Sequence, residues 1–206
     1  MNRVRSLTLG LIVVPAVLYW VLVILMMHFL EPEFNPIKVP MSAYVLGAYG
    51  GWMTTSFFAL SAALLAAGYG LAMTLPRTVL TWTAFFLFIV AAVWVLVAGI
   101  FPMNSPAAPR ASSGRWHGLA GLFAFPAMAI GPFLFSLTFY RDRQWRKISV
   151  PSLMLSGGIV AVFFLARFLR LDVGPAGYRQ RFFFALLTSW MLVVGFQLVR
   201  FRREPT

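Results

Sequence analysis

Long apolar stretches alternate with short polar segments along the whole chain. Six stretches contain no Lys, Arg, Asp or Glu: residues 6–30, 39–76, 78–109, 116–140, 148–166 and 182–199. The shortest has 18 residues, which as an α-helix extend roughly 27 Å at 1.5 Å per residue. That length about matches the ~30 Å hydrocarbon core of a bilayer. Trimmed at prolines and glycines, the stretches predict membrane-spanning helices near 7–30, 47–73, 79–100, 117–139, 149–168 and 181–200.

The predicted fold is all-α: a single integral membrane domain, residues 1–206, in which six transmembrane helices form a bundle. Six crossings place both termini on the same side of the membrane. If the N-terminus is inside, ten Lys and Arg flank the spans on the inner side and seven on the outer side. Cytoplasmic segments carry an excess of Lys and Arg, so this count favours the N-in/C-in orientation.

Composition and charge support a membrane location and exclude several kinds of site. Only 11% of the residues are charged, against about 25% in soluble domains. The 17 Lys and Arg outnumber the five Asp and Glu, but they flank the apolar stretches, where they act as topology signals and contacts for anionic lipid headgroups. We therefore expect membrane lipids as partners and no nucleic acid. The chain has no Cys, and we find no strong metal or nucleotide motif.

Two segments resemble a known family. "PMSAYVLGAYGGWMTTSFFALSAALLAAGYGL" (40–71) has a Ser entering a helix, then Gly and Gly-Trp, then a run of small residues. "AGIFPMN" (98–104) is followed by "HGLAGLFAF" (117–125). Together they resemble the small bacterial and archaeal membrane proteins catalogued as domain of unknown function 998, and the basic "RDRQWRKIS" (141–149) also fits. The resemblance implies a six-helix, multi-pass protein of a prokaryotic cytoplasmic membrane, without a known activity. Met103 and Asn104 stand where the family often has an Asp.

Polar residues gather on the predicted outer side, mainly in the segment between the third and fourth spans. His117 is the candidate catalytic residue, because imidazole exchanges protons near neutral pH. Arginine binds phosphate and carboxylate groups with two parallel hydrogen bonds. The candidate ligand- or headgroup-binding residues are Ser42, Tyr44, Trp52, Asn104, Arg110, Arg115, Arg167 and Arg170, and Arg179 and Arg181 complete an outer basic cluster.

The two histidines permit more than one interpretation. His28 and His117 are predicted at the same depth of the outer leaflet, so they are candidate haem or pigment ligands. The alternative is that His28 is an interfacial polar residue and His117 bonds a loop carbonyl. We predict no other metal site.

The segment 101–117 is predicted to be an ordered cap over an outer-leaflet cavity. Its prolines restrict the backbone, and Phe101 and Trp116 give it an apolar anchor at each end. We expect His117 to bond the loop backbone or Asn104, and Ser112 or Ser113 to cap the next helix.

Small and aromatic residues add two expectations about packing. Glycines at the start of the second and fourth spans and in the middle of the fifth (Gly47, Gly51, Gly118, Gly121, Gly157 and Gly158) are expected to let helices pack closely. Trp52, Trp82, Trp116 and Trp145 are expected at the membrane interfaces, and Trp20, Trp94 and Trp190 deeper in the bundle.

Two functions remain open, and the sequence leaves undecided whether the protein is an enzyme. Composition favours a non-catalytic subunit or assembly protein of a larger membrane complex with a lipid-contacting outer surface, because no span contains an Asp or Glu. The alternative is a lipid- or isoprenoid-binding membrane enzyme that uses His117 and Arg115 at an outer-leaflet cavity.

The orientation can be tested with one cysteine. Since the native chain has no Cys, a Ser113→Cys variant carries a single thiol. With both termini inside, a membrane-impermeant maleimide added to intact cells should label it. Labelling from the cytoplasmic side alone would reverse the orientation.

Overall fold

The computed structural model describes residues 3–105, 111–167 and 175–201. Six α-helices in this part of the chain are long and apolar enough to cross a membrane. They are α1 (Arg3–Leu30), α2 (Gly50–Thr74), α3 (Val79–Ile100), α4 (Ser112–Thr138), α5 (Ser149–Arg167) and α6 (Ala176–Arg200). Three short 3-10 helices, η1 (Met41–Leu46), η2 (Phe139–Arg141) and η3 (Trp145–Ile148), lie in the connections. The all-α, six-span fold is thus confirmed, and the orientation across the membrane stays a prediction.

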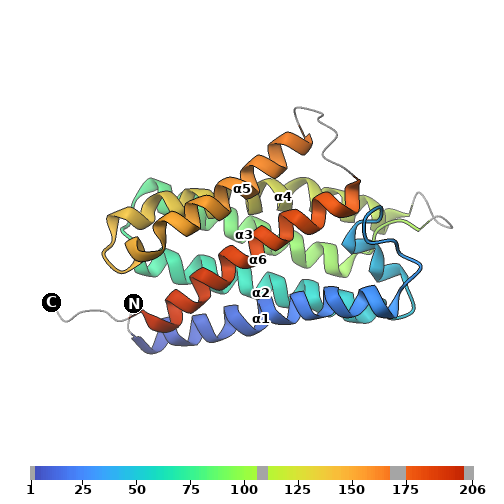
Figure 1. Ribbon diagram of the computed structural model, residues 1–206, viewed down its shortest axis with the longest axis horizontal. Helices are drawn as coiled ribbons and strands as arrows, with labels where there is room; N and C mark the ends of the chain where they lie inside the picture. Colours follow the sequence, from blue (N-terminus) through green and yellow to red (C-terminus); the bar gives the residue numbers. More distant parts are fainter. Residues whose placement is uncertain (1–2, 106–110, 168–174, 202–206) are drawn as a thin grey trace.

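The helices run side by side (Figure 1), and their packing contacts close them into a ring. Each helix packs against the next in the sequence, and α6 returns to pack against α1. The start of α1 and the end of α6 lie together at one end of the bundle, the termini end (Figure 1). The α1–α2 connector, residues 31–49, lies at the opposite end, the far end, which is the predicted outer side.

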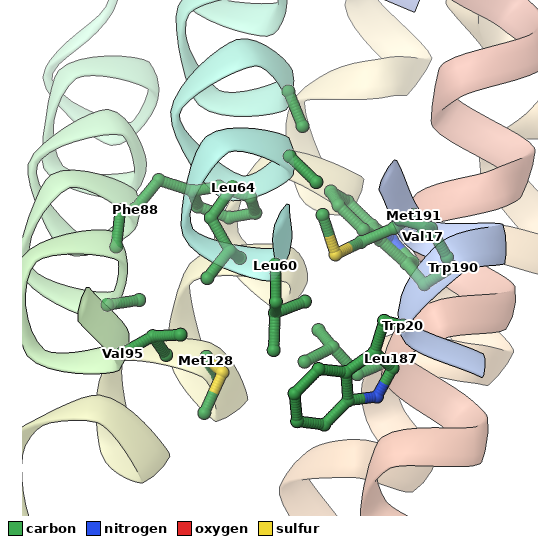
Figure 2. Close-up of a cluster of buried hydrophobic side chains, with 14 of the residues drawn as sticks. Val17, Trp20, Leu60, Leu64, Phe88, Val95, Met128, Leu187, Trp190 and Met191 are labelled. Atoms are coloured by element: carbon green, nitrogen blue, oxygen red, sulfur yellow. The ribbon is translucent and has the colours of Figure 1, made fainter. Parts of the chain in front are cut away.

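The core is formed mainly by five of the six helices. Figure 2 shows a part of it where large apolar side chains from α1, α2, α3, α4 and α6 meet, among them Trp20, Leu64, Phe88, Met128 and Trp190. By contrast, only 22% of the most apolar stretch of α5 is buried, against 61% for α2. Helix α5 therefore lies on the outside of the bundle.

Glycine produces close packing between α1 and α6. A Cβ on Gly10 would collide with the backbone of α6 at the Gly195 carbonyl, and a Cβ on Gly195 would collide with Val13 and Val14 of α1. Of the glycines predicted to bring helices together, Gly158 of α5 does so, because a Cβ there would come within 3.2 Å of Leu186 of α6. The other predicted contacts are not found. Gly47 ends η1 before α2 begins, and a Cβ at Gly51, Gly118 or Gly157 would meet nothing within 4 Å.

Near the termini end, Ser136 joins three helices. The indole Nε1 of Trp190 in α6 donates to Ser136 Oγ at 2.9 Å, and Ser156 Oγ of α5 lies 3.2 Å away. All three side chains are buried. Because lipid offers no competing hydrogen bonds, this contact holds α5 against α4 and α6 at this level of the bundle.

At the far end, Arg181 attaches the α1–α2 connector to α6. The sequence pattern starts the sixth span at this residue, but α6 begins at Ala176, so Arg181 lies one and a half turns inside the helix. Its guanidinium donates to the Val39 carbonyl at 2.9 Å, to Tyr44 Oη at 3.0 Å and to His28 Nε2 at 3.2 Å. Arg181 thus bonds protein groups at the far end, and its part in an outer basic cluster that binds headgroups stays a prediction.

We predict that Arg181→Met lowers the melting temperature. Losing one charged hydrogen bond costs about 1.5–3 kcal/mol, and about 1 kcal/mol shifts Tm by roughly 2–4 °C in a chain of this size. A fall of at least about 5 °C is expected in a thermal unfolding assay on purified protein. Arg179→Met is the matched control, since the Arg179 side chain lines an open groove. Equal Tm values for the two variants would contradict the structural role of Arg181.

Candidate functional site

A chamber of about 230 Å³ lies inside the far end of the bundle. Its wall is mostly apolar, with side chains from α1, α2, α3, α4 and α6 such as Trp20, Phe57, Val95 and Met128. Three polar side chains interrupt it, namely Ser42 of η1, His117 of α4 and Gln180 of α6. The chamber is thus an apolar space with a small number of polar groups, the usual character of a small-molecule site.

A groove of about 770 Å³ lies next to the chamber, between α4, α5 and α6. Figure 1 shows the far end of α5 standing away from α4 and α6. Among the described residues the groove wall is apolar apart from Arg179 and Gln180, and it includes Leu122, Ile130 and Phe163. The groove therefore lies where the far end of α5 stands apart from its neighbours.

The groove and the chamber adjoin each other. Both are lined by Gly118, Gly121, Phe125 and Gln180. A Cβ on Gly118 would meet nothing within 4 Å, and one on Gly121 would meet only the ring of Phe125, at 3.9 Å. These two glycines therefore leave room at the junction instead of packing against a helix.

His117 is held by the end of α3. Its Nδ1 lies 2.9 Å from the Phe101 carbonyl and 3.2 Å from the Ala98 carbonyl. The ring also meets Phe57 edge-on, with 6.3 Å between centroids. The expected bond from His117 to the loop backbone is therefore present, and it fixes the ring in the chamber wall.

The other two polar groups of the chamber are also positioned by contacts. Gln180 Oε1 accepts a hydrogen bond from the Met41 N–H at 2.6 Å, and Ser42 Oγ donates to Met103 Sδ at 3.7 Å. Both contacts tie η1 to a neighbouring segment. Ser42 thus joins His117 in the chamber, as the sequence suggested, whereas Gln180 was not anticipated.

Three other predicted site residues that the structure describes line neither cavity. Tyr44 is 1% exposed and binds Arg181 through its hydroxyl. Trp52 is 49% exposed and lines a separate surface depression beside Thr55. Arg115 is exposed on the first turns of α4. The arginine that lines the groove, among the described residues, is Arg179, which was not among the predicted ligand-binding residues.

The rest of the predicted site is described only in part. Asn104 lies against Gly114 of α4, so closely that a Cβ there would collide with its amide. Arg110, Arg170 and the side chain of Arg167 lie outside the described residues.

His28 does not join His117 in a shared ligand set. Its Nδ1 bonds the Ile24 carbonyl at 2.5 Å, and its Nε2 accepts from Arg181. Both nitrogens are therefore engaged within the protein, which leaves none to bind haem or a metal. Within the described part of the chain, no three His, Cys, Asp or Glu residues gather in a way that suits a metal ion.

The two ends of the segment 101–117 are anchored as expected, but the residue expected to cap helix α4 is not the one that the structure shows. Phe101 and Trp116 stack at 5.9 Å between ring centroids. However, Ala111 occupies the N-cap of α4 and makes no side-chain cap bond, while Ser112 and Ser113 are already helical. Residues 106–110 lie outside the described part, so the order of the cap stays a prediction.

Glu31 is a buried carboxylate that the sequence pattern marks only as an outer-loop charge. It is 1% exposed, and its Oε1 accepts the Tyr49 N–H just before α2. Burial raises the pKa of Glu31, an effect that the bond from Tyr49 opposes and the neighbouring Glu33 reinforces. Glu31 also lies against Gly47, so it fastens the connector to the start of α2.

Sequence reasoning missed the residues that create the cavity. Gly118 and Gly121 were assigned to helix packing, and residues 178–180 were placed before the sixth helix. The spacing of Gly118 and Gly121 after His117 is a signal that could have been used. Glycines one and four residues after a histidine leave part of the helix surface next to the imidazole without side chains.

Comparison with known proteins identifies the family of the chain. No curated protein and no solved structure matches the chain. The family model described as "Protein of unknown function (DUF998)" matches residues 14–197, a range that takes in all or most of each of the six helices. The chain therefore belongs to the DUF998 family, a family of proteins of unknown function.

Proposed function

We propose that this protein binds a membrane-soluble amphiphile of the lipid or isoprenoid class in the far-end cavity. The ligand enters sideways from the bilayer through the groove between α4, α5 and α6. The observation that carries the proposal is that Gly118, Gly121, Phe125 and Gln180 line both the groove and the chamber.

The cavity suits such a ligand in size and chemistry. Ligand sites in proteins occupy about 300–1,000 Å³, and the groove of 770 Å³ with its adjoining chamber of 230 Å³ reaches the upper part of that range. An apolar chain would replace lipid contacts along the groove. Polar groups are available at the inner end, at His117 and Gln180, and in the groove wall at Arg179.

No feature of the described residues specifically supports the hypothesis of an accessory subunit. Large apolar side chains are exposed on all six helices, and lipid alone accounts for them. A partner could use the same surface, and the groove would then hold a helix of that partner. Purification distinguishes these outcomes, because a partner subunit is a protein and an amphiphile is not.

We predict that Gly121→Leu removes the bound amphiphile without unfolding the protein. The added side chain enters the junction of groove and chamber, where a Cβ meets only Phe125, at 3.9 Å. Native mass spectrometry of protein extracted from membranes measures the retained ligand. The wild type should carry a small-molecule adduct, and the variant should lose at least about 90% of it.

Gly157→Leu is the matched control, because Gly157 also faces open space and is absent from the walls of both cavities. It should keep the adduct. A wild type that retains no amphiphile and instead carries a stoichiometric protein partner in the groove would overturn the proposed function. If both variants retain the adduct equally, the ligand does not bind in this cavity.

A further inference from the structure

The polar atoms of the chamber determine which hydrogen-bonding groups of a ligand can bind there. The hydrogen bonds that position His117 and Gln180 also fix which of their atoms donate and which accept. The remaining, unused atoms of these two side chains therefore specify a headgroup.

His117 offers an acceptor. Carbonyl oxygens only accept hydrogen bonds, so the bonds from Nδ1 to the Phe101 and Ala98 carbonyls require the proton on Nδ1. In the neutral ring Nε2 then carries a lone pair. None of the residues that the structure describes forms a hydrogen bond to Nε2, which belongs to a side chain of the chamber wall.

Gln180 offers a donor. Oxygen and nitrogen of an amide are distinguished by their partners, and the backbone N–H of Met41 can only donate. The atom that meets it is therefore Oε1. The NH₂ group of Gln180 forms no bond within the described part of the chain, and the side chain lines both chamber and groove.

We propose that the chamber binds the hydroxyl end of the amphiphile, as in a long-chain alcohol or a phenol. A hydroxyl donates one hydrogen bond and accepts others, so it suits the His117 acceptor and the Gln180 donor together. This inference rests on the proposed function and specifies its ligand. It concerns binding, with no chemical step.

An anionic headgroup fits the chamber less well. Burying an anion requires a cation or several donors to compensate for lost water. The chamber lining contains no Lys or Arg among the described residues, and the His117 lone pair would face the negative charge. Arg179 lies in the groove wall, so a phosphate or carboxylate would stop there, outside the chamber.

Three probes with the same chain test the headgroup: geranylgeraniol, its methyl ether, which lacks the donor, and geranylgeranyl phosphate. Each is titrated into full-length protein in nanodiscs, with affinity measured by native mass spectrometry. The alcohol should bind at least about tenfold tighter than the ether, the effect of one buried hydrogen bond. The phosphate should bind no tighter than the alcohol.

His117→Asn identifies the acceptor. The Asn amide can still donate to the Phe101 carbonyl but has no atom at the Nε2 position, so the fold is kept. This variant should bind alcohol and ether equally, with the ether affinity unchanged. His117→Phe, which fills the same space, is a second variant with the same expected loss. Trp52→Phe is the control, because Trp52 lines neither cavity, and it should keep the tenfold preference.

The outcomes separate the two proposals. Equal binding of alcohol and ether by the wild type would overturn the hydroxyl assignment and leave the proposed function standing. Tighter binding of the phosphate, lost in Arg179→Met, would also overturn it and assign an anionic headgroup to the groove. If none of the three probes binds, the proposed function fails as well.

Discussion

A polar group inside a bilayer has no water to bond, so its partner must come from the protein or from a ligand. This constraint explains the arrangement of most polar side chains in the bundle. Trp190 bonds Ser136, Gln197 bonds the Gln144 carbonyl, and Arg181 bonds the connector. At the far end, His117 Nε2 and the Gln180 NH₂ group are left without such a bond among the described residues. Both side chains lie at a cavity, where the proposed ligand would supply the missing hydrogen-bond partner.

The position of α5 determines whether that cavity can be reached. Near the termini end, the Ser136 contact holds α5 against α4 and α6. Toward the far end no similar polar contact joins these helices in the described residues, and the groove separates them. Glycines at 118 and 121 remove the side chains that would fill the junction. The groove, which is the proposed access route, is thus a consequence of close packing at one end of α5 and its absence at the other.

Hydropathy alone predicts the helices well, and for a physical reason. A span must be apolar along its whole length, so a charge marks its end. The third helix was predicted at 79–100, and α3 occupies Val79–Ile100. The same reasoning fails where a charge lies inside a helix. Arg181 was taken as the boundary of the sixth span, whereas α6 begins five residues earlier at Ala176, because tertiary hydrogen bonds stabilise the arginine there.

The candidate site could be predicted only in part, since apolar helices do not reveal which face is buried. His117 and Ser42 were identified from polarity alone, and both line the chamber. Trp145 was expected at an interface, but it is fully buried and stacks on Phe139 at 5.0 Å. The glycines were read as packing contacts, because a sequence cannot show whether a missing side chain brings helices together or leaves a space.

The most direct test of the central claim is an experimental structure of the protein in nanodiscs made from its native membrane lipids. The account predicts elongated non-protein density that enters between α4 and α6 and ends beside His117 and Gln180. A structure in which α5 packs along its whole length against α4 and α6 and leaves no room for a ligand between them would contradict it.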